Sequence, residues 1–160
     1  MATVGLSPNQ DTVTAEIRIA APPERVFAAI TDPQQVTKWW GQQNMYKITH
    51  WQNDLRPGGK WRSEGSGADG KVFHVEGEYV EVDPPRLLIH TWNPSYRDLP
   101  TTVVRWELQE YKGGTLVKLT HSGFGGHADA AKDHSQGWTR VLVWMEAFVE
   151  DGATVETRAA

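Results

Sequence analysis

Two histidines, His121 and His134, are the residues of this chain best placed to do chemistry. His121 alternates with Val117 and Leu119, and this period of two puts it on the inward face of a strand. His134 precedes Trp138 by one helical turn, so a helix carries both on its apolar face. An imidazole on such a face can bind, orient or protonate a ligand. We therefore predict that both histidines border one cavity.

A second interpretation of these histidines is structural, each being a hydrogen-bonded core residue beside a turn. A metal pair is a weaker interpretation, because a third ligand at a supporting spacing is missing. His127, two helical turns before His134, is a further imidazole that can share its face. We predict neither a metal nor a cofactor.

Motifs for covalent or nucleotide chemistry are missing from the sequence. It has no Gly-x-Ser-x-Gly elbow and no His-Glu-x-x-His zinc helix. The glycine-rich stretch 65–70 leads into another strand, so its Asp-Gly pair predicts a hairpin turn. No catalytic residue is assigned on these grounds.

Eight tryptophans supply large apolar surfaces, and in a hollow fold a core face is also a cavity wall. Trp106 and Trp138 are expected to pack sheet against helix. Trp39 and Trp40 cannot both point inward from a helix, so one is expected at the cavity mouth or under a loop. The phenol of Tyr79 is expected to reach inward. The predicted ligand-binding residues are Trp39, Trp40, Trp61, Tyr79, Trp92, Trp106, His121, His134, Trp138 and Leu142.

The elements that must position these residues are a run of strands and one long helix. Residues 128–151 carry an apolar stripe at helical spacing, and a helix of this kind must bury its stripe. We expect it to lie across the concave face of the sheet and to enclose a cavity. The prediction is an α+β fold, with a curved antiparallel seven-stranded sheet around the C-terminal helix and two short helices after strand one. The expected strands are 13–19, 45–51, 60–64, 71–82, 86–92, 101–110 and one that carries His121.

Composition predicts one globular domain, residues 12–152, between flexible tails at 1–11 and 153–160. Apolar residues make up 39% of the 160 residues and charged ones 22%, as in ordinary globular proteins. The net charge of −4 and the lack of a basic run argue against a nucleic-acid partner. Cysteine is absent, which excludes thiol catalysis and disulfides and fits a reducing compartment. Without a signal-peptide pattern or a bilayer-spanning run, we expect a cytoplasmic protein that does not insert into membranes.

Several phrases of the sequence, in their joint order, resemble a known family. They cover roughly residues 12–151 and look most like homologues of the activator of the 90-kDa heat-shock protein ATPase, a branch of the START-like superfamily. The resemblance is to the C-terminal type of domain in that family. The phrases are 19–27, Asp32 and Pro33 with Trp39 and Trp40, 57–61, 77–87, 114–124, and His134 with Gly137 and Trp138.

The resemblance implies a helix-grip fold whose cavity, between sheet and long helix, holds hydrophobic or amphipathic molecules such as lipids. The leading hypothesis is therefore binding of a small hydrophobic ligand. The alternatives are a cyclase- or hydrolase-like enzyme in the same cavity, and a chaperone-associated or homodimeric interaction module. Catalysis requires His121, His134 or Tyr79 to converge on one ligand. An interaction module requires an exposed apolar patch or a charged convex face.

Overall fold

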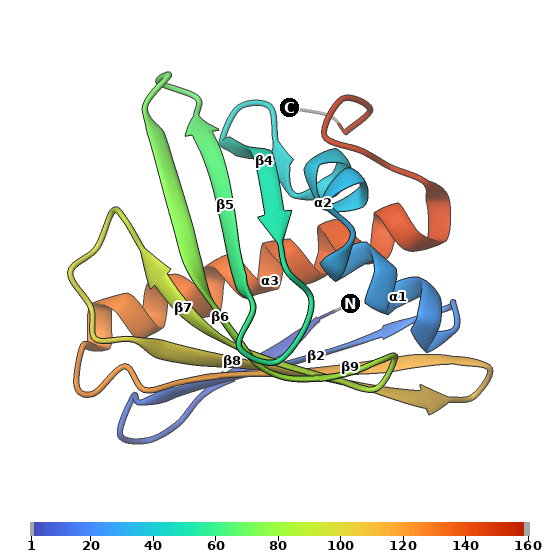
Figure 1. The fold of residues 1–160 in the computed structure, drawn as a ribbon, viewed down its shortest axis with the longest axis horizontal. Helices are drawn as coiled ribbons and strands as arrows, with labels where there is room; N and C mark the ends of the chain where they lie inside the picture. The colour runs from blue at the N-terminus through green and yellow to red at the C-terminus, as the bar shows by residue number, and fades with distance from the viewer. Residues whose placement is uncertain (1, 159–160) are drawn as a thin grey trace.

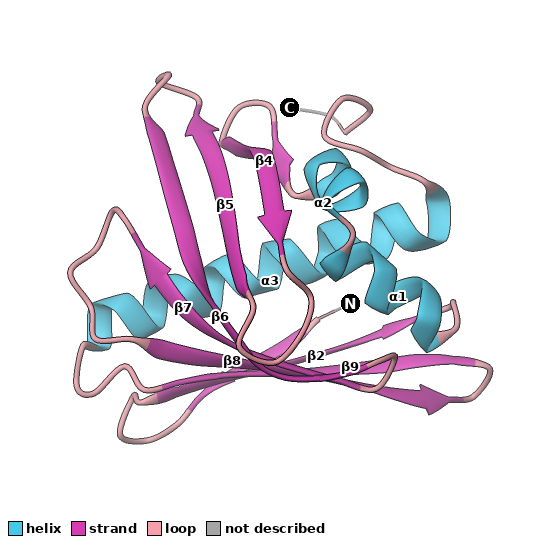
Figure 2. Ribbon diagram, viewed as in Figure 1, coloured by secondary structure: helices cyan, strands magenta, loops and turns pink. Residues whose placement is uncertain are grey.

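The computed structural model describes residues 2–158 and consists of antiparallel strands followed by a long helix, as Figure 2 shows. Two short helices interrupt the strands early in the chain. The elements are β1 Thr3–Leu6, β2 Thr12–Ile19, α1 Pro23–Thr31, α2 Pro33–Trp39, β3 Gly41–Gln42, β4 Tyr46–Asn53, β5 Lys60–Gly67, β6 Val72–Asp83, β7 Leu87–Pro94, β8 Thr102–Tyr111, β9 Gly114–Ser122 and α3 Ala128–Asp151.

The strands form one sheet in the order β1-β2-β9-β8-β7-β6-β5-β4-β3, and every neighbouring pair is antiparallel. This confirms the predicted helix-grip architecture, although the described sheet has nine strands instead of seven. The two additional strands, β1 and β3, are the edge strands and contain only four and two residues. Such short segments carry too little alternation to be detected in the sequence.

The first of these edge strands corrects the expectation of a flexible tail over residues 1–11. Within it, Thr3–Leu6 pairs with residues 13–16 of β2. Leu6 and Val4 are partly buried against the core. Backbone hydrogen bonds and this partial burial therefore hold the segment on the sheet. Residue 1 lies outside the described residues.

The sheet bends so that β4, β5 and β6 stand across β2, β8 and β9, and α3 crosses its concave side (Figure 1). Register shifts lie between Ile48 and His50 on β4, and between Tyr79 and Glu81 on β6. A bulge of this kind increases the local twist and bends the strand. Gly77 of β6 permits a close approach inside the bend, because a Cβ there would lie 2.2 Å from the carbonyl oxygen of Thr91.

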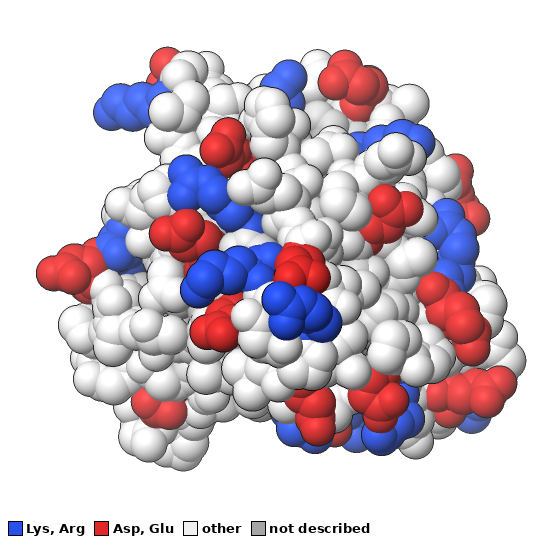
Figure 3. Space-filling model, in the orientation of Figure 1, with Lys and Arg blue, Asp and Glu red and all other residues white. Residues whose placement is uncertain are grey.

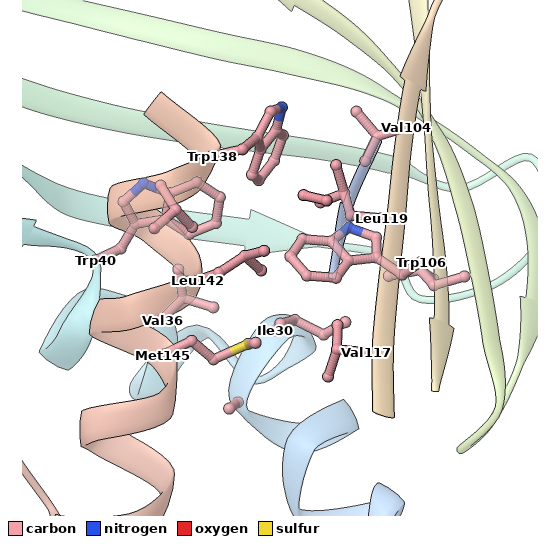
Figure 4. Packing of buried hydrophobic residues seen from close by; sticks show 14 of the residues in the cluster. Ile30, Val36, Trp40, Val104, Trp106, Val117, Leu119, Trp138, Leu142 and Met145 are labelled. Atoms are coloured by element: carbon pink, nitrogen blue, oxygen red, sulfur yellow. The ribbon is translucent and has the colours of Figure 1, made fainter. Parts of the chain in front are cut away.

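The apolar face of α3 packs against the sheet and against α1. Leu142 and Met145 are fully buried, and Figure 4 shows them pointing from α3 toward Trp106 and Val117, with Ile30 beside them. The helix ends at Gly152, whose left-handed φ of 73° allows its N–H to bond back to the last turn. None of the described helices combines the length and hydrophobicity that crossing a bilayer requires.

The segment after α3 also corrects an expectation, since residues 153–158 are docked and not a free tail. Val155 is 3% exposed, and its N–H donates to the carbonyl of Lys38 at 2.8 Å. Arg158 donates to the carbonyls of Trp39, Gly41 and Trp144, and its guanidinium lies over the Trp144 ring. Residues 159 and 160, at the end of the predicted tail, lie outside the described residues.

The surface mixes charges of both signs, as the face drawn in Figure 3 shows. Arg62 on β5 pairs with Glu64 and with Glu76 of the neighbouring strand, and Arg105 pairs with Glu107 on β8. These are exposed pairs on the outer face of the sheet, of the kind that contributes little to stability.

Replacing Arg158 tests whether the docked C-terminal segment stabilises the fold. We expect Arg158→Ala to lower the free energy of unfolding by about 1–2 kcal/mol, because three backbone carbonyls lose a charged donor. Urea unfolding followed by tryptophan fluorescence measures this change. Arg56→Ala, which removes an exposed pair with Asp54, is the matched control and should change stability little. Equal stability of the two variants would show that the Arg158 contacts add nothing.

Candidate ligand cavity

An open cavity of about 520 Å³ lies between strands β4–β7 and the first half of α3. Its wall is mostly apolar, and its volume is in the range that holds a drug-sized molecule. Gly137 and Val141 of α3 form the helix side of the wall. The largest rings on the wall belong to Tyr46, Trp51, Phe73, Trp92, Tyr96 and Trp138.

The predicted ligand-binding residues divide into three groups in the structure. Those that line the cavity are Trp40, Trp92, His134 and Trp138. Trp61, Tyr79 and Trp106 lie deeper, where together with Trp40, Trp92 and Trp138 they surround a separate void of about 10 Å³. The remaining three are buried and line neither space: Trp39, His121 and Leu142.

Both members of the Trp39–Trp40 pair are buried, and only Trp40 also lines the cavity. Trp39 is 0% exposed and Trp40 is 6% exposed. The helix ends at Trp39, and Trp40 adopts an extended backbone with φ −85° and ψ 96°. Helical spacing therefore no longer separates the two side chains, and their rings stack with centroids 5.2 Å apart. Trp39 Nε1 donates to the carbonyl of Ala29 at 2.8 Å.

Three buried histidines each accept a hydrogen bond from a tryptophan indole. An imidazole can accept only through an unprotonated nitrogen, so each histidine is neutral and in a defined tautomer. These pairs join β7, β8, β9 and α3 around the inner end of the cavity. They are Trp106 to His90 at 3.2 Å, Trp138 to His121 at 3.0 Å and Trp92 to His134 at 3.3 Å.

The second nitrogen of each imidazole is also occupied. His121 Nε2 donates to the hydroxyl of Thr102 at 2.7 Å, and this hydroxyl donates in turn to the carbonyl of Trp92 at 3.2 Å. His134 Nδ1 donates to the carbonyl of Ala130 at 2.8 Å, and His90 Nδ1 lies 3.1 Å from the carbonyl of Thr91. No ring nitrogen of these histidines is therefore left free to bind a ligand or accept its proton.

Burial lowers the pKa of all three imidazoles. The pKa of His90 falls from 6.5 to about 4 through desolvation, against which its hydrogen bond to a backbone carbonyl acts. Desolvation, and then the neighbouring His134 and His90, hold the pKa of His121 well below its usual value. Burial likewise lowers the pKa of His134. All three are uncharged at neutral pH, as the tryptophan donors require.

The residues named for catalysis converge only in part. His121 and His134 meet with ring centroids 5.1 Å apart, but only His134 lines the cavity. Tyr79 lies instead beside His90, with ring centroids 6.2 Å apart. Its hydroxyl accepts a hydrogen bond from Asn53 at 2.9 Å, and burial raises its pKa to about 12. Within residues 2–158, no group of three or more His, Cys, Asp or Glu side chains is arranged to hold a metal ion.

Sequence reasoning missed several residues of the cavity wall. Phe73 alternates with Val75 on β6, and Tyr46 alternates with Ile48 on β4, so a strand period was available as a signal. Trp51 was also missed. It lies on the wall with a buried Nε1 that has no hydrogen-bond partner among the described residues.

Charged residues surround the cavity mouth, and sequence patterns gave no signal for them. Arg97, in the loop after β7, forms an ion pair with Asp133 of α3. Lys71 and Asp69 come from the turn between β5 and β6, and Arg140 comes from α3. The turn, the loop and the helix that carry these residues are far apart in the sequence, and the curvature of the sheet brings them together.

The curved sheet, the long helix across it and the cavity between them define a helix-grip domain. The sequence matches the family described as Activator of Hsp90 ATPase homolog 1-like protein over residues 20–150. This match spans most of the chain, which therefore belongs to that family.

Solved structures share the fold over nearly the whole chain. Protein Ms6760 from Mycobacterium smegmatis is 25% identical, with a TM-score of 0.80 over 94% of this chain and 98% of its own. Protein CV1439 from Chromobacterium violaceum is also 25% identical, with a TM-score of 0.77 over 88% and 97% of the two chains. The AHSA1-like protein from Aeromonas hydrophila is 23% identical, with a TM-score of 0.71 over 86% and 91%. No functionally curated protein matches the sequence.

The neutral histidines predict that the fold loses stability in mild acid. In the unfolded chain His90 takes up a proton near pH 6.5, but in the folded protein it does so only near pH 4. The free energy of unfolding therefore falls as the pH drops from 6.5 toward 4. At about pH 5 the loss from His90 alone is about 2 kcal/mol, at 1.36 kcal/mol for each pH unit below 6.5. Urea unfolding at several pH values measures the slope.

His90→Gln provides the comparison, because its amide can still accept from Trp106 but does not titrate. This variant should show a shallower loss of stability between about pH 6.5 and pH 5 than the unmodified protein. Stability that is constant over this range in the unmodified protein would contradict the neutral tautomers assigned above.

Proposed function

We propose that this protein binds a small hydrophobic or amphipathic molecule in the cavity between β4–β7 and α3. The observation that carries the proposal is Gly137, which lies within α3 and on the cavity wall. A glycine inside a helix costs about 1 kcal/mol relative to alanine. A Cβ at this position would meet no atom within 4 Å, so packing does not require glycine there. Its absent side chain leaves space for a ligand.

The wall chemistry supports the same proposal. Trp92 and Trp138 present indole surfaces whose N–H groups are already bonded to His134 and His121. These rings are held in place before a ligand arrives, so little side-chain freedom is lost on binding. Apolar area buried on such a wall contributes roughly 25 cal/mol per Å².

Binding is favoured over acid–base catalysis because of the occupied imidazoles. His134 is the histidine on the cavity wall, and both of its nitrogens already have partners in Trp92 and Ala130. A general base must reach the proton that it removes, which here requires one of these bonds to break. The occupied nitrogens of His134 therefore favour ligand binding over acid–base catalysis in this cavity.

The proposal is tested with phenylnaphthylamine, a neutral aromatic probe whose emission rises in an apolar site. We expect saturable binding with energy transfer from the tryptophans on the wall. Gly137→Leu should weaken binding by about tenfold or more, because its side chain occupies the cavity. The affinity is measured by fluorescence titration.

Gly137→Ala is the matched control for this substitution. Its single methyl group should leave most of the affinity and raise the free energy of unfolding by up to about 1 kcal/mol. If the unmodified protein fails to bind the probe, or if Gly137→Leu binds it equally well, the proposed function is wrong.

A further inference from the structure

We infer that the bound molecule is an amphipathic aromatic anion whose negative group is held at the cavity mouth by Arg140 and Tyr46. This inference rests on the proposed function and specifies its ligand class. A carboxylate or sulfonate on an aromatic ring system fits the chemistry of the mouth and the wall.

Arg140 is a cation without a partner on the cavity wall. It is exposed on α3, three residues after Gly137, and no carboxylate within residues 2–158 forms an ion pair with it. The other arginine at this mouth, Arg97, is already bound to Asp133. A guanidinium offers a planar set of donors that matches carboxylate and sulfonate oxygens.

Tyr46 supplies a neutral donor on the wall of the same cavity. Its hydroxyl oxygen accepts a hydrogen bond from Trp40 Nε1 at 3.3 Å, and among the described residues its own proton has no acceptor. Burial raises the pKa of this phenol, while the bond from Trp40 and the positive charge of Arg140 partly oppose the rise. The phenol is therefore protonated at neutral pH, and it can donate to an anion that also contacts Arg140.

The local charge at the cavity has the opposite sign to that of the whole chain. The complete sequence carries a net charge of −4. The residues that line the cavity include three cations, Lys71, Arg97 and Arg140, against two carboxylates, Asp69 and Asp133. Asp133 is neutralised by Arg97, and Asp69 accepts the backbone N–H of Lys71 at 3.0 Å. These five side chains together carry a net charge of +1, which favours an anionic ligand group at the mouth.

The aromatic part of the ligand follows from the interior of the cavity. Phe73, Trp92 and Trp138 offer flat surfaces behind the charged mouth. Aromatic rings pack well on such surfaces in stacked or edge-to-face geometry. A ligand with one anionic end and one aromatic body therefore satisfies both regions at once.

The test compares two probes that differ by one charged group. Anilinonaphthalene sulfonate is phenylnaphthylamine with a sulfonate added to the naphthalene ring. We expect Arg140→Gln to raise the ratio of the Kd of the sulfonated probe to the Kd of the neutral probe about tenfold. Tyr46→Phe should shift the same ratio in the same direction by a smaller factor, and added salt should weaken only the sulfonated probe.

Lys132→Gln is the matched control, because it removes the same charge from an exposed position on α3 outside the cavity. It should leave both Kd values unchanged, and thermal unfolding checks that each variant is folded. If the neutral probe binds but Arg140→Gln affects both probes equally or neither, the anion site is wrong and the cavity function stands. If neither probe binds the unmodified protein, the proposed function fails, and this inference fails with it.

Discussion

The structure depends on the burial of the apolar face of α3 against the concave side of the curved sheet (Figure 1). Along the second half of the helix, the sheet and α1 come close, and Leu142 and Met145 are fully buried. Along the first half, the bulged strands β4 and β6 diverge from the helix, and the space above Gly137 is open. One helix therefore closes the hydrophobic core at one end and forms the wall of a cavity at the other.

The three tryptophan–histidine pairs allow that cavity to have a stiff wall. A large indole beside empty space loses packing contacts on one side, so its orientation must be held in another way. For Trp92 and Trp138 this is done by hydrogen bonds to His134 and His121. Because both nitrogens of each imidazole are satisfied, the polar groups add directionality without leaving a buried donor unpaired. The same arrangement makes these imidazoles poor acids and bases.

Under the proposed function, the polarity of the cavity would give one site two independent criteria for selecting a ligand. An apolar, aromatic interior selects by shape and buried area, which gives affinity but little discrimination. Its mouth adds Arg140, which has no ion-pair partner among residues 2–158, and an available hydroxyl on Tyr46. A charged group at the right distance from an apolar body is a stricter requirement than either feature alone.

The sequence by itself determined the long helix, most of the strands and the family, because these depend on local periodicity and on short phrases of residues. It also placed His121, His134 and Trp138 on inward faces, where the structure has them. Only the tertiary structure decided which aromatic residues line the cavity and which lie in the core. The reason is that the bulge after Ile48 resets the alternation of β4 before Trp51, and that Trp40 leaves the helical spacing. The pairing of indoles with imidazoles, and the isolation of Arg140, depend on contacts between distant segments that no local pattern encodes.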